Sequence, residues 1–345
     1  GTGLVHCAPA FGEDDHRVLQ ILERKDFPCP IDFKGCFTEA VKAYEGEYIK
    51  TADKQIIKDI KNLGQLFDHK TCVHSYPFCP RSDTPLIYRT IPSWYIKVEA
   101  VKQQLLNNND QIHWVPGHIQ HGRFGKWLEG ARDWAISRNR VWGTPLPIWI
   151  NDTTNNRYCV GSIKELETLT GQSVNDLHRD HVDHLTFTLP NEKGTYRRVE
   201  EVLDCWFESG SMPYAQSHYP FDNKASFEEA FPADFIAEGL DQTRGWFYTL
   251  TVLSTLLFDK PAFQHVIANG IVMAEDGKKM SKRLKNYTAP DELMEQHGAD
   301  ALRLYLMNSG LVKGEEQRFT DSGVKDMVRR TLLPWHNAFK FLHTY

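Results

Sequence analysis

Apolar and polar positions in the second half of the chain alternate between the spacing of strands and that of a helix. The pattern predicts a short buried strand at residues 234–239 ("DFIAEG"), a helix at 241–258 and a second strand at 265–273 ("HVIANGIVM"). This order is typical of a parallel sheet with crossover helices. We therefore predict an α/β domain in this part of the chain.

Further helices are expected on both sides of this unit. They are residues 51–66, whose apolar residues recur at helical spacing, the polar segment 95–110, and residues 118–140, 290–298 and 299–310. Gly64 lies near the end of the first segment, while Pro290 and Gly298 are start and stop signals for the fourth. From about residue 320 the pattern predicts the beginning of a helical bundle.

Other segments have strand-like or irregular composition. Residues 1 to about 90 contain short β-type runs ("GLVHCAP", "CVHSYPF", "PLIYRT"), and residues 151–200 are polar and rich in turn residues. We expect a β-rich first region and a small insertion at 151–200.

Length, charge and cysteines limit the classes of protein to consider. The 345 residues can form two or three domains, and a net charge of −5 argues against a protein that coats nucleic acid or membrane. The longest apolar stretch, residues 246–258, is too short to cross a bilayer, so we expect a buried helix. The seven scattered cysteines predict free thiols in a reducing compartment, and no signal peptide is evident.

The stretch "KKMSKRLKN" (278–286) is strongly basic although the chain is acidic overall. It follows a predicted strand and the turn "AEDG", and ligands of open parallel sheets bind beyond the carboxyl ends of strands. A loop carrying several lysines there could hold nucleotide phosphates and neutralise charge on departing pyrophosphate. By composition alone, a solvated loop or a nuclear address remains an alternative.

The residue sequence of this loop is similar to a family signature. "KMSKR" (279–283) resembles the Lys-Met-Ser-Lys-Ser signature of class I aminoacyl-tRNA synthetases, with Arg283 in place of the last serine. "DFIAEGLDQTRGWF" (234–247), "DCWFESGSMPYAQSHYPF" (204–221) and "WAISRNRVWGTPLPIW" (134–149) resemble the isoleucine-specific members, as does "GADALRLYL" (298–306). The amino-acid sequence of 204–221 looks most like that of the eukaryotic cytosolic form.

The resemblance implies a Rossmann-type catalytic domain that activates isoleucine with ATP and Mg²⁺ and transfers it to tRNA(Ile). It implies charge stabilisation by Lys279 and Lys282. The implied ATP-binding residues are Asn269, Gly270, Lys279, Met280, Ser281 and Lys282, and those for the aminoacyl-adenylate are Glu238, Gly239, Asp241, Gln242, Trp206 and Trp246. Ordinary core packing of the tryptophans and helix N-terminal charge for Glu238 and Asp241 are the alternatives.

The first segment, "GTGLVHCAPAFGEDD" (1–15), resembles part of the family's editing domain. A pocket for isoleucine cannot strongly exclude valine, a limit for which the isoleucine-specific synthetase is the standard example. Asp15 matches the carboxylate that holds the misacylated amino group, and His6 matches a histidine of that pocket. Glu13 and Asp14 have a simpler interpretation as acidic residues at a helix start.

The family's other signature, His-Ile-Gly-His, does not occur in the sequence. The chain also begins without Met and stops within an apolar-periodic stretch, so we expect it to be part of a longer protein and inactive alone. The expected layout is 1–93 editing domain, 94–150 return into the catalytic domain, 151–200 insertion, 201–287 second half of the Rossmann domain, 288–315 helical stem-contact region and 316–345 start of the anticodon-binding helical domain.

Metal sites are not predicted. Cys79 begins a Cys-Pro-Arg-Ser segment where some bacterial relatives have Cys-x-x-Cys, so we expect no zinc there. Ligation by Cys72, His74 and Cys79, or by the three histidines and two aspartates of 178–184, is the alternative. The expected setting is the cytoplasm, with a multi-synthetase complex as a possible partner and no membrane. Two other functions stay open: a valyl or leucyl relative, and a non-catalytic tRNA-binding module.

Overall fold

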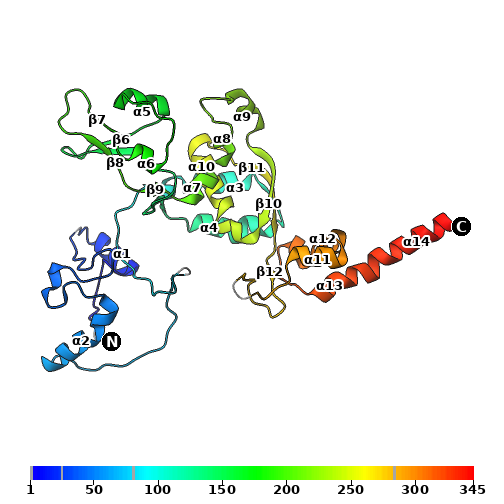
Figure 1. The fold of residues 1–345 in the computed structure, drawn as a ribbon, viewed down its shortest axis with the longest axis horizontal. Coiled ribbons are helices and arrows are strands. Elements are labelled where there is room, and N and C mark those ends of the chain that lie inside the picture. Colours follow the sequence, from blue (N-terminus) through cyan, green and yellow to red (C-terminus); the bar gives the residue numbers. More distant parts are fainter. Residues whose placement is uncertain (1–2, 25, 80–81, 283–284) are drawn as a thin grey trace. The chain divides into compact units, whose positions relative to one another are not determined.

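The computed structural model describes residues 3–24, 26–79, 82–282 and 285–345. The chain divides into two compact units, Gly1–Pro92 and Ser93–Tyr345. Figure 1 draws both in sequence colours, from blue at the N-terminus to red at the C-terminus.

The first unit consists of helices and irregular chain. Its helices are α1 (Glu13–Ile21), η1 (Glu39–Tyr44) and α2 (Ile49–Asn62). Its described part has the isolated bridges Ile31↔Phe37, Cys36↔Tyr48 and Phe78↔Pro85, but no strand. The prediction of strands in the β-type runs is therefore wrong. β-Branched and aromatic residues form a strand only where a partner completes the ladder, and in the first run Leu4 and Val5 are instead largely exposed.

The helix predicted at residues 51–66 is confirmed as α2. It ends two residues before Gly64, whose φ of +69° suits a residue without a side chain.

The second unit is built around a parallel sheet with strand order β10-β11-β2. Its elements are β1 (Tyr95–Ile96), η2 (Val98–Val101), α3 (Lys102–Asp110), β2 (His113–Val115), η3 (Gln120–Phe124), α4 (Gly125–Glu129), β3 (Trp134–Ala135), β4 (Ser137–Arg138), β9 (Val202–Leu203), α7 (Cys205–Gly210), α8 (Met212–Ala215), α9 (Lys224–Ala230), β10 (Ala233–Gly239), η4 (Leu240–Arg244), α10 (Trp246–Phe258) and β11 (Phe263–Asn269). The predicted strand–helix–strand unit is thus confirmed as β10, α10 and β11.

Helix α10 supplies much of the core beneath this sheet. It packs against α7 and α3, which lie beside it in Figure 1. Phe247, Leu250 and Val252 of α10 are buried with Trp114 and Phe263 of the sheet. The expectation of a buried helix at 246–258 is therefore correct.

The strand predicted to be buried at 234–239 is instead an exposed edge. β10 pairs only with β11 in the described chain, and its Phe235 is 55% exposed. An apolar run predicts a strand but cannot tell whether both of its edges and faces are covered.

The helix predicted at 118–140 is wrong beyond Gly130. α4 ends at Glu129, and the next residues form β3 and β4. β3 pairs with β1, and β4 pairs with β9 more than sixty positions away. The helix predicted at 95–110 likewise begins only at Val98, because Tyr95–Ile96 is the partner of β3. These distant pairings override the local spacing.

Residues 148–198 form a small module with a sheet and core of their own. Its elements are β5 (Ile148–Asn151), β6 (Arg157–Cys159), α5 (Ile163–Thr170), α6 (Arg179–Val182), β7 (Thr186–Phe187) and β8 (Tyr196–Arg198), with antiparallel order β6-β5-β8-β7. Trp149, Leu166, Val182 and Phe187 belong to its buried core.

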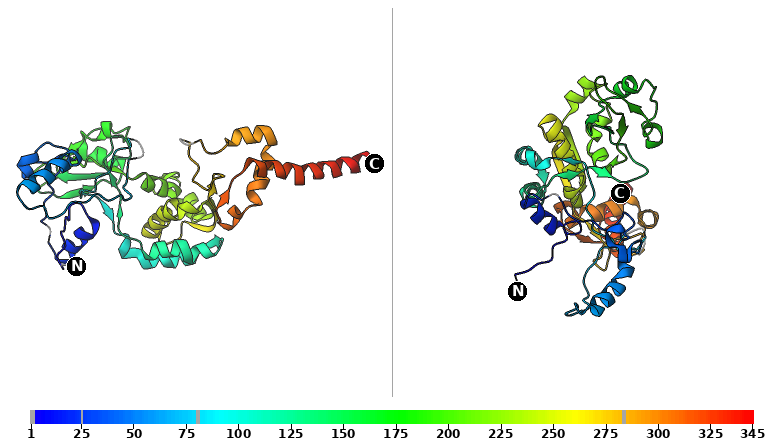
Figure 2. Two further views of the ribbon diagram at one scale, coloured as in Figure 1. Left: turned by 90° about the horizontal axis from the view of Figure 1, so that it is seen from below. Right: turned by 90° about the vertical axis from the view of Figure 1, so that its left-hand side faces the viewer.

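The last segment is mainly helical. Its elements are β12 (Val272–Met273), α11 (Pro290–His297), α12 (Ala299–Met307), η5 (Gly310–Lys313), β13 (Gln317–Arg318), α13 (Asp321–Met327), η6 (Val328–Leu332) and α14 (Leu333–Thr344). Figure 2 shows α14 as one uninterrupted helix up to the C-terminus. Pro290 and Gly298 bound α11 as predicted.

Gly270 connects the sheet to this last segment and gives a test of the fold. A Cβ at Gly270 would overlap the carbonyl oxygen of Glu315, and the Gly270 N–H donates to the Leu311 carbonyl at 2.8 Å. We expect Gly270→Ala to lower the free energy of unfolding by about 2 kcal/mol, measured by urea denaturation, because the backbone must move to admit the methyl group. Gly122→Ala is the control, since nothing lies within 4 Å of its Cβ position. Equal stability of the two variants would contradict the packing.

Candidate active site

The carboxyl edge of the parallel sheet brings together residues from two loops. β10 and β11 pair in register, with Glu238 opposite Ala268 and Gly239 opposite Asn269; Gly270 follows directly. Neighbouring strands lie about 4.8 Å apart, so these positions are close in space. This edge is where ligands bind in open parallel sheets.

Asp241 and Gln242 lie in η4, the turn between β10 and α10. Gln242 Oε1 accepts a hydrogen bond from the Trp246 backbone N–H at 3.0 Å, and its Nε2 donates to Asp241 Oδ2 at 3.1 Å. Gln242 therefore satisfies an N–H group of the first turn of α10 and also orients the neighbouring carboxylate. Since Asp241 is exposed, its carboxylate can accept hydrogen bonds from an ammonium group or from hydroxyls.

Trp206 and Trp246 lie on neighbouring helices. The ring of Trp206 lies against Gly245, where a Cβ would be 3.3 Å from it, and Trp246 Nε1 donates to the Ser209 carbonyl at 3.0 Å. Trp246 and Ile236 are among the residues that line a cavity of about 150 Å³, whereas Trp206 is not. The structure thus brings the two predicted tryptophans near each other without placing both on one cavity.

Asn269 and Gly270 end the second strand of the site. Asn269 is exposed, so its amide can reach a ligand at the sheet edge. The contact of Gly270 with Glu315 explains the glycine without any ligand. Its approach to adenine therefore stays a prediction.

The basic loop after β12 begins with a tight turn. Gly277 (φ +77°) donates to the Ala274 carbonyl, and Ala274 donates to the Lys278 carbonyl, both at 2.8 Å. Asp276 accepts from the Lys278 N–H at 3.0 Å, which holds the pKa of Asp276 below its ordinary value. Asp276 also forms an ion pair with the Lys278 ammonium at 3.4 Å.

The rest of the loop is anchored through its backbone and through Met280. Asn286 accepts from the Ser281 N–H at 2.9 Å and donates to the Lys279 carbonyl at 3.2 Å, and Met280 packs against the cluster that contains Leu293. Lys279 and Lys282 are exposed, and neither forms an ion pair with another described residue. Arg283, the predicted departure from the signature, lies outside the described residues. The exposed ammonium groups of Lys279 and Lys282 are thus carried by an anchored backbone and can bind an anion.

Asp204 was not predicted as a site residue, although it organises this region. Its side chain is 5% exposed, and its carboxylate accepts from Arg138 Nη2 at 2.8 Å and from Trp134 Nε1 at 3.2 Å. It also accepts from the Trp206 backbone N–H, which caps α7. Asp204 therefore fixes the start of the helix that carries Trp206. An aspartate just before a helix was the available signal.

The predicted editing residues lie in the first unit. His6 is exposed in irregular chain, and Asp15 lies in the first turn of α1. Asp15 Oδ2 accepts from the Ala8 N–H at 2.8 Å and so closes the turn before the helix. No contact recorded among the described residues joins His6 to Asp15.

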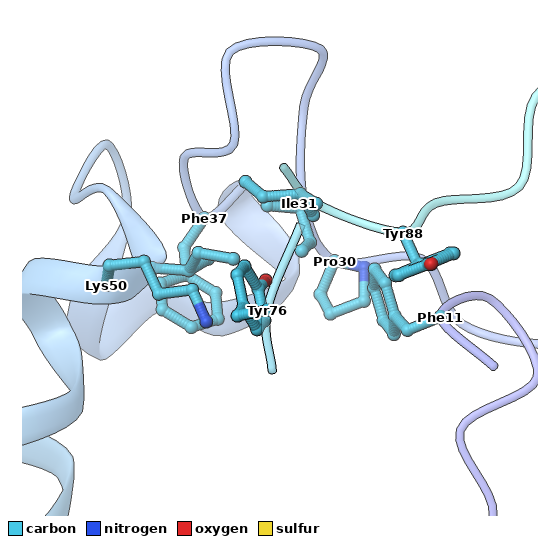
Figure 3. A pocket seen from close by; sticks show the side chains of 9 residues that line it. Phe11, Pro30, Ile31, Phe37, Lys50, Tyr76 and Tyr88 are labelled. Atoms are coloured by element: carbon cyan, nitrogen blue, oxygen red, sulfur yellow. The ribbon is translucent and has the colours of Figure 1, made fainter. Parts of the chain in front are cut away.

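A separate apolar pocket of about 360 Å³ lies in the same unit. Figure 3 shows Lys50 and Tyr76 on one side of it, with Phe11 and Tyr88 on the other. The Lys50 ammonium is 5.0 Å from the centre of the Tyr76 ring, a cation–π contact. Neither His6 nor Asp15 lines this pocket.

The weak metal alternatives do not form a ligand cluster in the part of the chain that the structure describes. Cys72 is exposed, and the ring of His74 bonds to the Ser75 carbonyl at 2.9 Å. In the histidine-rich segment, Asp176 bonds to His178 at 2.6 Å and Asp183 is paired with arginines.

Among the helices that the structure describes, none combines the length and the hydropathy that a membrane span requires.

Comparison with known proteins gives a consistent picture. Residues 28–318 match the family model of class I tRNA synthetases (I, L, M and V). The chain is 57% identical over 345 residues to the cytoplasmic isoleucine–tRNA ligase of Mus musculus, covering 99% of this chain and 27% of that protein. It is equally similar to the isoleucine–tRNA ligase of Chlamydia caviae, with 57% identity, all of this chain and 33% of that protein. For the cytoplasmic enzyme of Arabidopsis thaliana the values are 56%, 99% and 29%. The chain thus spans about a third or less of the length of these relatives.

The Asp204 network predicts a specific loss of stability. Asp204→Ala removes the acceptor of the Arg138, Trp134 and Trp206 donors, so we expect the free energy of unfolding to fall by about 3 kcal/mol in urea denaturation. Arg138 is partly exposed and regains some hydration, which keeps the loss below that of a fully buried pair. Asp180→Ala is the control, because its side chain is 75% exposed, and we expect a change below about 0.5 kcal/mol. If both variants unfold at the same urea concentration, Asp204 does not have this role.

Proposed function

Because the chain belongs to the class I tRNA synthetases of the isoleucine, leucine, methionine and valine group, we propose that the whole protein is an isoleucine–tRNA ligase. One observation carries this proposal. The identity of 57% to the mouse and chlamydial isoleucine enzymes extends over 345 residues, so it includes every segment with a candidate site residue, from His6 to Lys282.

The proposed reaction has two steps. The carboxylate of isoleucine attacks the α-phosphorus of ATP, the bond to the bridging oxygen breaks, and pyrophosphate leaves. The isoleucyl group of the adenylate then passes to a hydroxyl of the terminal ribose of tRNA(Ile), and AMP leaves. Mg²⁺ would accompany ATP and neutralise part of its phosphate charge. No protein nucleophile is needed, so positioning and electrostatics supply most of the rate.

Lys279 and Lys282 are the residues that would stabilise the charge on pyrophosphate. Their support is the loop geometry: both ammonium groups are exposed, and the backbone that carries them is held by Asn286 and Met280. Met280 and Ser281, the other loop residues of the predicted ATP site, would lie near the same phosphates, and Asn269 with Gly270 would lie against the adenine.

The other predicted residues would bind the aminoacyl part. Glu238, Gly239 and Asp241 stand where one strand ends and the next helix begins, so a carboxylate there can hold the ammonium group or the ribose hydroxyls. Gln242 would keep Asp241 oriented through their hydrogen bond. Trp206 and Trp246 would form the apolar walls around the isoleucine side chain.

The free edge of β10 fits a catalytic domain that is completed by further chain. We propose that the first half of a Rossmann-type fold, carrying the His-Ile-Gly-His signature, pairs with this edge. The exposed backbone of β10 and the exposed Phe235 support this placement, because unpaired edges and apolar side chains are normally covered.

The remaining assignments follow from the family. Residues 1–93 would be the end of an editing domain in which Asp15 holds the amino group of misacylated valine and His6 lines the pocket. Residues 288–315 would contact the tRNA stem, and 316–345 would begin the anticodon-binding helices. We place the protein in the cytoplasm, where a multi-synthetase complex is a possible partner, because relatives from mouse and Arabidopsis carry that location in their names.

The test is ATP–pyrophosphate exchange by the whole protein, with isoleucine, valine and leucine compared at equal concentrations. We expect isoleucine to give the highest exchange by kcat/KM. Preference for valine or leucine would assign the protein to a neighbouring branch. Absence of exchange together with retained tRNA binding would identify a non-catalytic module.

The loop lysines can be tested in the same assay. We expect Lys279→Ala and Lys282→Ala each to lower kcat by about a hundredfold, because each removes charge stabilisation in the transition state. Lys278→Ala is the matched control in the same loop, since its ammonium is paired with Asp276, and kcat should change less than about threefold. Equal losses in all three variants would mean that loop structure, not these two charges, determines the rate.

A further inference from the structure

Three exposed basic side chains lie around the turn that follows β10. Arg123 belongs to η3, Lys126 to α4 and Arg244 to η4, and we call these three residues the basic surface. Residues 118–132, which include η3 and α4, contain three arginines or lysines and one carboxylate, Glu129, in a chain whose net charge is −5. The basic surface is therefore a local region of positive charge on an acidic protein.

Arg244 is oriented by an aromatic ring. Its guanidinium carbon lies 4.9 Å from the centre of the Trp127 ring, a cation–π contact. Tyr248 packs against the same indole, with ring centres 5.8 Å apart and ring planes at 77°. A guanidinium over an aromatic face keeps the N–H groups at its edge available, and their geometry matches the oxygen atoms of a phosphate.

Arg123 is anchored to the same turn. Its Nε donates to Thr243 Oγ1 at 3.1 Å, and that hydroxyl donates to the Leu240 carbonyl at 2.8 Å. Because Thr243 directly precedes Arg244, both arginines lie at one turn of the chain. The two Nη groups of Arg123 have no recorded partner among the described residues, so they can donate to a ligand.

The positive charge of the basic surface is not neutralised by neighbouring carboxylates. Within the part of the chain that the structure describes, no ion pair involves any of its three residues. Acidic residues of the same region have other contacts: Asp110 lies 3.7 Å from His121, and Asp133 accepts from the Glu99 N–H at 3.1 Å. Positive groups that are held in place without a counter-charge favour a polyanionic partner.

The basic surface adjoins the turn that is predicted to bind the adenylate. Asp241 and Arg244 both belong to η4, a 3₁₀ turn in which side chains three residues apart lie on the same face. The rise between them along the turn is about 6 Å. Both side chains are exposed, and no ion pair between them is recorded in the described chain. An anion bound at Arg244 would therefore lie next to the adenylate.

The reacting end of tRNA(Ile) is the polyanion that best fits this position. In the second step of the proposed reaction, the terminal ribose must reach the adenylate, so the phosphates of the strand that carries it must pass close to η4. The phosphates of ATP are the other candidate, but these are already assigned to Lys279 and Lys282 of the basic loop. Successive phosphates of a strand also suit separate cations on several elements.

We propose that the basic surface binds backbone phosphates of the 3′-terminal strand of tRNA and thereby positions the terminal ribose for transfer. This inference rests on the proposed ligase function and deepens it, because it assigns residues to the transfer step and not to adenylate formation. Arg244, held by Trp127, contacts the phosphate nearest to the adenylate, and Arg123 and Lys126 contact phosphates further along the strand. Such contacts fix the register of the strand and carry no sequence information.

Lys126→Ala is the first test, because no side-chain contact of Lys126 is recorded among the described residues. Aminoacylation of tRNA(Ile) and ATP–pyrophosphate exchange are measured with the same preparation of the whole protein. We expect kcat/KM for tRNA to fall about tenfold through a higher KM, and exchange to change less than about twofold, since adenylate formation involves no tRNA phosphate. Lys193→Ala, at an exposed position of the 148–198 module, is the matched control and should change neither activity.

Direct binding of a tRNA(Ile) transcript gives a second measurement that does not depend on activity. Fluorescence anisotropy at increasing KCl concentration yields the slope of log Kd against log salt. We expect this slope to become shallower by about 0.7 in Lys126→Ala and in Arg123→Ala, because each loses one phosphate contact of a single strand. Arg123→Lys keeps the charge but not the guanidinium that donates to Thr243, so its slope should stay that of the unchanged protein. Circular dichroism confirms that each variant is folded.

Three outcomes would overturn the proposal. They are equal aminoacylation by Lys126→Ala and Lys193→Ala, an unchanged salt slope in Arg123→Ala, and equal losses of exchange and aminoacylation, which would assign the basic surface to ATP. Normal isoleucine-dependent exchange together with any of the first two outcomes rejects only the basic surface. If isoleucine-dependent exchange is absent from the unchanged protein, the proposed ligase function fails, and the salt slopes still decide whether these residues bind tRNA.

Discussion

The parallel pairing of β10 with β11 is the constraint on which the candidate active site depends. It sets Gly239 opposite Asn269, so two loops that are about thirty residues apart in the chain leave the sheet at one edge. A shift of this register would separate Glu238 and Asp241 from Asn269. The pairing is in turn held from below by α10, whose buried Phe247 and Val252 leave little freedom to slide.

Two polar residues connect this sheet edge to the chain around it. Gln242 joins the turn after β10 to the first turn of α10, and Asp204 joins α7 to the segment that contains Trp134 and Arg138. Both side chains satisfy donors at a helix start, where backbone N–H groups lack partners. Their structural role therefore coincides with the positioning of neighbouring site residues: Asp241 beside Gln242, and Trp206 just after Asp204.

The basic side chains of the loop and of the small module are used differently. In the loop, Lys279 and Lys282 are exposed charges on an anchored backbone, which suits a large anion such as a nucleotide phosphate. In the 148–198 module, by contrast, the buried Arg198 guanidinium is paired with Asp183 and with the carbonyls of Leu146 and Glu201, so its charge stabilises the fold.

The sequence by itself determined the strand–helix–strand unit, the helix that ends near Gly64, and α11 between Pro290 and Gly298. In these segments the local signals agree with the packing. It also singled out Glu238, Asp241, Asn269 and the loop lysines, through the resemblance of several separate segments to one family.

Tertiary structure decided everything that depends on a distant partner. Trp134–Ala135 became a strand because Tyr95–Ile96 lies beside it, and Gly270 is constrained by the backbone of Glu315. The β-type runs of the first unit did not become strands, and the strand at 234–239 became an exposed edge. Arg198 likewise donates to the Leu146 carbonyl, 52 positions away in the chain. The spacing of apolar residues along the sequence indicates which face of a helix or strand is apolar. Strand pairing and burial depend instead on which surfaces come into contact in the folded chain.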